Sequence, residues 1–351
     1  MENGARRVYP QAEIVWAPLA DGGEGTLAAL TADGTAHVRT CRVHDPLDGY
    51  VQAQWAFLAD GRAVIEMAQA SGLPLIPLEK RDAKAASSYG TGQLIKAALD
   101  AGCREILVGI GGSATTDGGT GALSALGAIF RDEKDVVLPP GGAALKRLKT
   151  IDLRYFDKRL EKASITLLCD VTNPLCGENG AAHVYGPQKG ATPQDVEILA
   201  AGLRQLADVS YTLLHRNFST DSGAGAAGGL GFGLMAFCGA RPRSGIEVVL
   251  EATHFSEKLQ GADLVLTGEG ALDAQTLQGK TIAGVCKAAK AKGVPVLGFA
   301  GKVALNGAEM DELGLKSAFP IVDGPRDLAY CLAHANELIE TSAERALRVV
   351  I

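Results

Sequence analysis

The sequence predicts an α/β protein with a largely parallel sheet, divided into two domains. Apolar runs of strand length alternate with segments in which apolar residues recur at helical spacing. Glycine occurs 44 times and clusters directly after several of the apolar runs. The chain has 351 residues. This exceeds the roughly 250–300 residues over which one core usually grows, so two domains are expected.

Five apolar runs predict buried strands that end in turns, and the strand in the fourth run is expected to stop at Thr267. The runs are AEIVWAPL (12–19), REILVGIG (104–111), SITLLCDV (164–171), ADLVLTGEG (262–270) and VPVLGFAGK (294–302). Between them, three segments have apolar residues three and four positions apart, which predicts helices. They are 91–103, 196–218 and 281–293.

One stretch, residues 37–70, follows a different pattern. Its polar and apolar residues alternate, and it contains two turn signals, PLDG (46–49) and DG (60–61). These features are typical of hairpins, so the sheet is expected to be mixed there. If the first unit belongs with the C-terminal α/β block, domain boundaries fall near 36–41 and 260–261.

Composition and charge exclude several classes of protein. A formal charge of −6 gives no electrostatic reason to expect nucleic acid or an anionic membrane as partner. The seven cysteines include no C-x-x-C pair, which argues against a zinc site and a disulfide framework. No apolar run approaches the ~18 residues of a membrane span, and no signal-peptide core is present. We expect a soluble, cytoplasmic protein.

Four glycine-rich turns share one chemical design. All four are rich in glycine, at 20–26, 109–121, 169–191 and 222–233, and the first three also contain one or two carboxylates. In open α/β sheets, turns at the carboxyl ends of strands form the ligand crevice, where helix N-termini present free N–H groups to anions. Isolated carboxylates there hold a cation or accept a proton. This combination suits phosphoryl transfer.

The segment TGEGALDAQTLQGKT (267–281) ends like a P-loop but does not match one. Ala274 stands where the P-loop rule requires its first glycine. Glu269 and Asp273 would repel a bare triphosphate unless a divalent cation lay between them. The segment is therefore interpreted as a turn that binds a metal ion and phosphate. The alternative is a strand-to-helix turn in which Asp273 and Thr276 cap the following helix.

A dinucleotide fingerprint is a weaker alternative. Residues 223–228 match G-x-G-x-x-G, and Glu247 stands at about the right distance to bind a ribose. However, the residues before the match are polar (HRNFSTD), whereas the fingerprint follows a strand. A nicotinamide-dependent oxidoreductase is therefore disfavoured.

Taken together, six segments resemble the bacterial type I glycerate kinase family. They are PLADGGEGT, SSYGTGQLI, GIGGSATTDGG, CDVTNPLCGENGAAHVYGPQKGA, GAGAAGGLGFG and LTGEGALDAQTLQGK. The resemblance implies MgATP-dependent phosphorylation of D-glycerate, usually to 2-phosphoglycerate, with 3-phosphoglycerate as the alternative product. It also implies a Rossmann-like domain (1–40 plus 261–351), an inserted α/β domain with a mixed sheet (41–260), and a site in the cleft.

Within that resemblance, Asp170 is expected to be the catalytic base, with Asp117 as the second candidate. Lys280 is expected to clamp phosphate, and Glu269 and Asp273 to bind Mg²⁺. Twelve further residues are expected to bind substrate or phosphate: Asp21, Gly22, Gly23, Glu24, Ser87, Gly111, Gly112, Ser113, Thr115, Thr116, Asn173 and Lys189.

The sequence departs from the family pattern at its start. Relatives normally begin with an additional strand and helix that carry an Asp-Ser-Phe-Lys motif, which does not occur here. The first strand of the Rossmann-like sheet is therefore expected to be missing. This leaves, as an alternative, a relative that binds ligand without turnover. The sequence does not indicate an oligomeric state.

Overall fold

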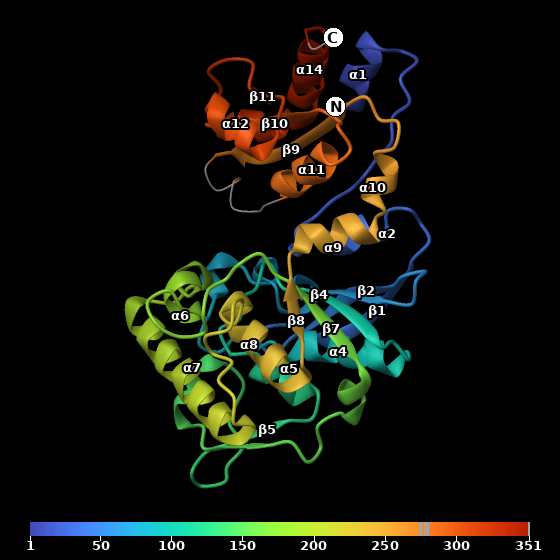
Figure 1. Ribbon diagram of the computed structural model, residues 1–351. Helices are drawn as coiled ribbons and strands as arrows, with labels where there is room; N and C mark the ends of the chain where they lie inside the picture. The colour runs from blue at the N-terminus through green and yellow to red at the C-terminus, as the bar shows by residue number, and fades with distance from the viewer. Residues whose placement is uncertain (274–275, 277–280, 350–351) are drawn as a thin grey trace. The chain divides into compact units, whose positions relative to one another are not determined.

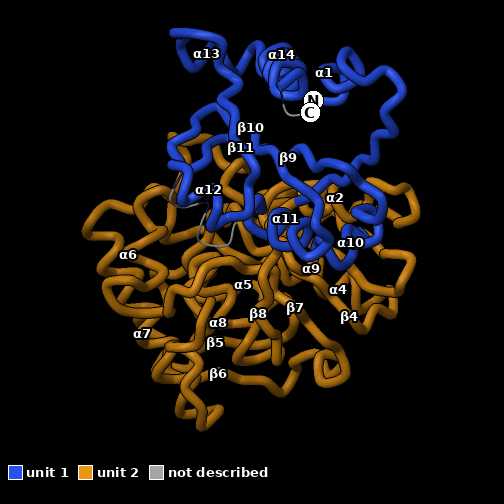
Figure 2. Tube along the Cα trace, turned by 45° about the horizontal axis from the view of Figure 1, so that its top comes forward, with its two compact units in different colours: residues 1–19, 249–351 blue, residues 20–248 orange. Residues whose placement is uncertain are grey.

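The structure, a computed structural model, describes residues 1–273, 276 and 281–349. The chain divides into two compact units (Figure 2): unit 1 comprises residues 1–19 and 249–351, and unit 2 comprises residues 20–248. Each unit has its own hydrophobic core. The α/β fold class is as predicted, whereas the unit boundaries fall earlier in the chain than the expected 40/41 and 260/261.

Unit 2 is built on a six-stranded mixed sheet (Figure 1), in the order β1-β2-β3-β4-β7-β8. Strands β1, β2 and β3 pair antiparallel, and β3, β4, β7 and β8 pair parallel. The hairpins and the mixed sheet predicted for residues 37–70 are thus confirmed. The strands are β1 (His37–His44), β2 (Tyr50–Phe57), β3 (Ala63–Glu66), β4 (Glu105–Gly109), β7 (Ser164–Leu168) and β8 (Arg241–Arg243), and a separate hairpin consists of β5 (Ile129–Arg131) and β6 (Thr150–Asp152).

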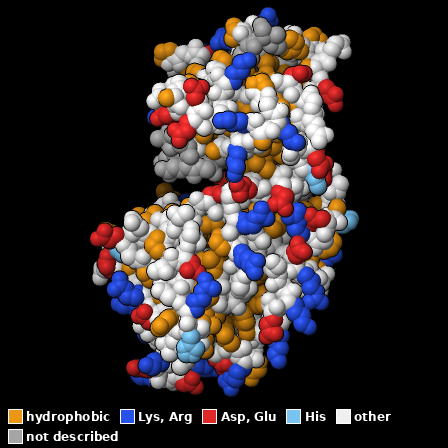
Figure 3. All heavy atoms as spheres, viewed as in Figure 1, with side chains coloured by type: hydrophobic (Ala, Val, Ile, Leu, Met, Phe, Trp, Pro, Cys, Tyr) orange, Lys and Arg blue, Asp and Glu red, His pale blue; other side chains and the backbone are white. Residues whose placement is uncertain are grey.

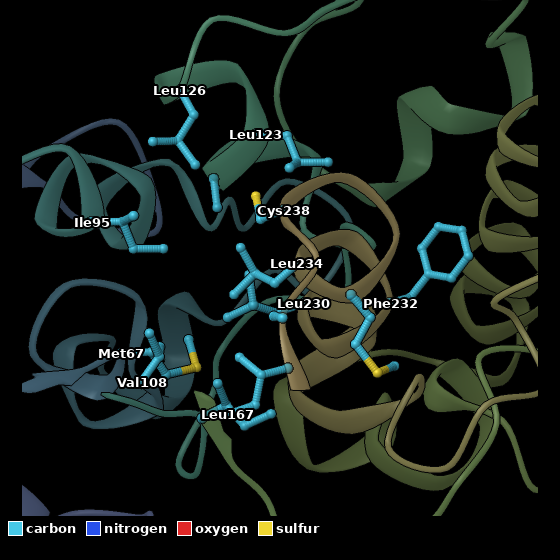
Figure 4. Packing of buried hydrophobic residues seen from close by; sticks show 14 of the residues in the cluster. Met67, Ile95, Val108, Leu123, Leu126, Leu167, Leu230, Phe232, Leu234 and Cys238 are labelled. Carbon is cyan, nitrogen blue, oxygen red and sulfur yellow. The ribbon is translucent and has the colours of Figure 1, made fainter. Parts of the chain in front are cut away.

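The core of unit 2 shows why these apolar runs form strands. Alternate residues such as Ile106 and Val108 of β4 join one buried cluster, which also contains side chains of α4, α5 and α8 (Figure 4). Their neighbours Leu107 and Leu168 point to the other face and are also buried. Both faces are therefore covered, which accounts for continuous apolar runs in the parallel part of the sheet.

Helices of unit 2 connect the strands. They are α2 (Thr26–Thr31), α3 (Ala68–Ser71), α4 (Tyr89–Asp100), α5 (Thr120–Ala125), α6 (Ala181–Tyr185), α7 (Pro193–Leu214) and α8 (Ala226–Cys238). Short 3₁₀ turns are η1 (Leu73–Leu75), η2 (Leu78–Lys80), η3 (Gly142–Arg147), η4 (Lys158–Lys162) and η5 (Pro187–Lys189). Helix α7 begins with a capping box, in which Thr192 and Asp195 satisfy each other's backbone N–H groups.

Unit 1 contains a three-stranded parallel sheet in the order β11-β10-β9. Helix α11 lies between β9 and β10 in the chain and α12 between β10 and β11, as expected for βαβ units. The strands are β9 (Val265–Leu272), β10 (Val296–Val303) and β11 (Ser317–Pro320). The helices are α1 (Glu2–Val8), α9 (Gly245–Ala252), which starts in unit 2, α10 (Phe255–Lys258), α11 (Thr281–Lys290), α12 (Gly307–Leu313), α13 (Leu328–Ala333) and α14 (Ala335–Leu347).

Two sequence predictions about unit 1 were wrong. Residues 12–19 form no strand, and Val15 and Trp16 are 57% and 69% exposed. No strand pairs with residues 12–19 in the described structure, and the Trp16 indole instead donates a hydrogen bond to Glu2. Conversely, β9 does not stop at Thr267 but continues to Leu272, because β10 pairs with it as far as Val303↔Leu272.

Acidic and basic side chains intermix on the face drawn in Figure 3. Among the described residues, none of the helices has both the length and the apolar character needed to cross a bilayer.

Candidate functional site

Four parallel strands of unit 2 end side by side. The register pairs Glu66 of β3 with Gly109 of β4, Gly109 with Leu168 of β7, and Leu168 with Arg243 of β8. The segments that follow these strands therefore leave the sheet at one edge. In a parallel α/β sheet this carboxyl edge is where ligands bind.

Residues 20–25 lie against the same edge. The Gly111 amide donates a hydrogen bond of 3.1 Å to the Gly22 carbonyl. A Cβ on Gly22 would lie 2.6 Å from the Leu168 carbonyl oxygen, and its φ of +96° is in the left-handed region. Only glycine permits this crossing of two backbones.

Asp170 stands at this edge, two residues after β7 ends. Its Oδ1 accepts a hydrogen bond of 3.1 Å from the Gly245 amide, at the start of α9, and its carboxylate also accepts from the Ser244 side chain. Although Asp170 is accessible to solvent, partial burial raises its pKa. The Ser244 and Gly245 hydrogen bonds oppose that shift, and the negative charges of Asp21 and Glu247 add to it. A carboxylate in this environment is a better proton acceptor than an ordinary aspartate.

Glu66 also lies at this edge, at the end of β3, and was not predicted from the sequence as a candidate site residue. It is 3% exposed, and its two carboxylate oxygens accept hydrogen bonds from the Gly25 and Leu27 amides, at 3.3 and 3.1 Å. Burial raises its pKa, and the charge of Glu24 contributes to the shift. Glu66 thereby fixes residues 20–27 on the sheet edge. The available signal was an acid that ends the apolar run AVIE.

The loop after β4 contributes Gly111, Gly112 and Ser113. The Gly112 carbonyl accepts a hydrogen bond from the Leu73 amide, and a Cβ on Gly112 would lie 3.3 Å from Glu24 Oε1. Ser113 is 8% exposed and forms a bridge with Gly72. Gly111 and Gly112 thus lie close to the segment 21–24.

Asp117 lies in the interior of unit 2. It is 0% exposed, and its carboxylate accepts hydrogen bonds from the Ser88 amide and hydroxyl, both at 2.8 Å, and from the Gly119 and Gly121 amides, at 3.0 and 3.1 Å. The neighbouring Ser87 hydroxyl accepts from the Tyr89 amide. With four donors on its oxygens, the Asp117 carboxylate ties α4 to α5.

Three more of the expected binding residues also lie inside unit 2. Thr115 and Thr116 are 0% exposed, and Lys189 is 1% exposed, with its Nζ donating to the Thr115 carbonyl at 2.6 Å. Burial lowers the pKa of Lys189 to about 7. Asn173 is half-buried, and its side chain donates to the Asn179 carbonyl and accepts from the Tyr185 hydroxyl.

Glu269 and Asp273 belong to unit 1. The Glu269 carboxylate accepts a hydrogen bond of 2.6 Å from the Thr276 hydroxyl, and the Thr276 amide donates to the Asp273 carbonyl at 2.9 Å. Lys280 lies outside the described residues. Within the described ranges, no group of three or more His, Cys, Asp or Glu side chains is arranged to hold a metal.

Unit 1 also contains a cavity of about 290 Å³ beyond the end of β11. Its walls include the stacked rings of Tyr330 and His334, with centroids 4.0 Å apart. None of the predicted site residues that the structure describes lines this cavity, so the cavity does not coincide with the expected site.

The structure also argues against the dinucleotide fingerprint at 223–228. No strand precedes this segment; a turn leads into α8, which is kinked at Ala227, Gly228 and Gly229. A Cβ on Gly228 would overlap the Thr115 carbonyl oxygen. The glycines serve internal packing, which removes the basis for an oxidoreductase.

Comparisons with known proteins identify the family to which this chain is similar. The model of the Glycerate kinase family matches residues 1–351. The glycerate kinase of Bacillus subtilis (strain 168) is 44% identical over 344 residues, which are 98% of this chain and 90% of that protein. The glycerate 2-kinase of Escherichia coli (strain K12) is 43% identical, covering 96% of this chain and 89% of that protein.

A crystal structure assigned to glycerate kinase 2 of Salmonella typhimurium LT2 superimposes with a TM-score of 0.84 at 43% identity, over 98% of this chain and 91% of that one. The family match over the whole chain, together with these relatives, shows that this chain belongs to the glycerate kinase family and is a kinase.

Proposed function

We propose that this protein transfers the γ-phosphoryl group of MgATP to D-glycerate and releases 2-phosphoglycerate and ADP. Family membership supports a glycerate kinase activity, and the name of the Escherichia coli relative supports the 2-phosphate product. The observation that carries the proposal is the carboxyl edge of unit 2, where Asp170 lies at the start of α9 beside the glycine-rich segment 20–25.

Asp170 is the proposed general base. Phosphoryl transfer to an alcohol requires that the attacking hydroxyl lose its proton, and a positioned carboxylate can accept it. The hydrogen bonds from Ser244 and Gly245 fix the orientation of the carboxylate. Its raised pKa makes it more basic than an ordinary aspartate carboxylate.

Phosphate binding is assigned to unit 1. Glu269 and Asp273 offer oxygen donors, which Mg²⁺ prefers, and one or two carboxylates suffice when phosphate oxygens and waters complete its shell. The hydrogen bond from the Thr276 hydroxyl orients the Glu269 carboxylate. Bound Mg²⁺ would neutralise phosphate charge. Lys280 is proposed to bind a phosphate group, and with a protein charge of −6 such local cations are needed.

The remaining segments are proposed to surround glycerate. Residues 21–24 and 111–113 lie at the same edge as Asp170 and are rich in glycine, so their backbone can approach a small ligand. We further propose a cytoplasmic location, because all seven cysteines are free thiols, as is usual in a reducing compartment.

A two-part assay tests this function. ADP release is measured with D-glycerate and Mg²⁺, and the product is offered to enolase, which dehydrates 2-phosphoglycerate directly. Turnover with an immediate enolase signal is expected. A signal that requires added phosphoglycerate mutase would indicate 3-phosphoglycerate, and ligand binding without ADP release would contradict the catalytic proposal.

A further inference from the structure

Lys189 is the largest side chain that is buried completely in the part of the chain that the structure describes. It ends the short turn η5, and its Nζ reaches the Thr115 carbonyl. Lysine is almost never buried completely unless it is paired. Its position therefore calls for an explanation other than the direct contact with substrate or phosphate expected from the sequence.

The charge of Lys189 is compensated only in part. Asp117 favours the charged form, but burial outweighs it and lowers the pKa of the ammonium to about 7. The Asp117 oxygens are already occupied by Ser88, Gly119 and Gly121. A methionine of similar length at position 189 would avoid this desolvation, but it would leave the Thr115 carbonyl without this donor and the Asp117 carboxylate without this positive charge. The role of the lysine therefore follows from the groups that its ammonium holds.

The loop that Lys189 touches leads to the proposed site. Three of its amides are hydrogen-bonded: Gly111 to the Gly22 carbonyl, Ala114 to the Ser71 carbonyl, and Gly118 to the Gly228 carbonyl. Between Ala114 and Gly118, the Lys189 ammonium supplies a side-chain anchor at the Thr115 carbonyl.

Within that stretch the side chains fix only the C-terminal end, where the Asp117 carboxylate accepts hydrogen bonds from Ser88, Gly119 and Gly121. The hydroxyls of Thr115 and Thr116 are buried without a hydrogen-bond partner in the described structure. At these two threonines the path of the backbone therefore depends on contacts to its own carbonyls and amides.

We propose that Lys189 is a positioning residue: its buried ammonium holds the Thr115 carbonyl and thereby fixes the loop after β4 against residues 20–25. The consequence for catalysis rests on the proposed kinase function. A misplacement of about 1 Å in a catalytic site can cost roughly 10²-fold in rate.

Replacement of Lys189 by methionine (K189M) tests the inference, with K158M as a matched control at an exposed lysine of unit 2. In ligand-free protein, hydrogen exchange at the Gly111, Ala114 and Gly118 amides is expected to become at least tenfold faster in K189M. In the kinase assay, kcat should fall by roughly 10- to 100-fold. The melting temperature should fall by about a few degrees at most, because the loss of the donor to the Thr115 carbonyl is offset in part by the removal of a buried charge. K158M should match the wild type in all three measurements.

A chemical rescue separates positioning from packing. Lys189→Ala removes the ammonium and three methylene groups, and added propylammonium restores them; partial recovery of kcat is expected, with none from propanol. The proposal would be overturned if K189M kept the wild-type kcat and the wild-type rates of hydrogen exchange at the loop amides. It would also be overturned if K189M lost activity and melted at a lower temperature without faster exchange at those amides. If the wild type showed no glycerate kinase activity, the exchange result would still decide whether Lys189 anchors the loop.

Discussion

Replacing Asp170 with asparagine removes the proposed base while preserving its place in the structure. The amide oxygen of asparagine can still accept the Gly245 hydrogen bond that the Asp170 Oδ1 accepts at 3.1 Å. The start of α9 therefore stays capped, and we expect stability to change by less than about 1 kcal/mol. The proton acceptor, however, is lost.

The expected kinetic effect follows from the usual scale of general base catalysis. Loss of the base should lower kcat by roughly 10²- to 10⁴-fold, or about 2.7 to 5.4 kcal/mol of activation free energy. Since partial burial raises the pKa of Asp170 above 3.8, the wild-type kcat should begin to fall at a higher pH on acidification than an ordinary aspartate would give. The residual activity of D170N should lack that acidic fall.

Coupled ADP release at saturating D-glycerate and MgATP, recorded across the acidic pH range, measures both effects. Asp135→Asn is the matched control, because this aspartate is 85% exposed and has a φ of +62°, which asparagine tolerates well. A wild-type kcat in D170N, or an unchanged acidic fall, would refute the assignment of Asp170 as base.

Three further predictions concern the surroundings of the site. Asp117→Ala should lower the free energy of unfolding by at least ~3 kcal/mol, because three buried amides lose their acceptor; a smaller loss in urea melts would contradict the structural role of Asp117. Burial raises the pKa of Glu66, so just above pH 4.5 the folded state binds more protons than the unfolded state. The free energy of unfolding of the wild type should therefore fall relative to that of Glu66→Gln as pH rises through that window. A difference in unfolding free energy that does not change with pH would contradict this prediction. Chelation of Mg²⁺ should abolish turnover and leave the melting temperature of the ligand-free protein unchanged, as differential scanning fluorimetry would show; turnover that persists in chelator would exclude the metal role of Glu269 and Asp273.

Much of the α/β fold could be predicted from local patterns. The runs that became β4, β7 and β10 are continuous and apolar, because both faces of a parallel sheet are covered, and the helical segments kept their periodicity as α4, α7 and α11. Prediction failed where pairing decided the outcome. Residues 12–19 are apolar but found no neighbouring strand, whereas the glycine-rich end of β9 remained a strand because β10 pairs with it.

The site was predictable to a different extent. The place of Asp170 follows from the rule that ligands bind at the carboxyl ends of strands, whereas residues 21–24 lie at the same edge although no strand precedes them. The burial of Asp117 and Lys189 could not be predicted, because a carboxylate or ammonium in a glycine-rich loop has the same local sequence whether it faces water or the core. Glu66 was missed because its role depends on residues 25–27, about 40 positions earlier in the chain.

A crystal structure of the complex with D-glycerate, Mg²⁺ and a non-hydrolysable ATP analogue would show which group faces the attacking hydroxyl. We expect a glycerate hydroxyl within about 2.6–3.2 Å of the Asp170 carboxylate, the range required for proton transfer. Glycerate bound elsewhere, with Asp170 contacting only Ser244 and Gly245, would contradict this expectation.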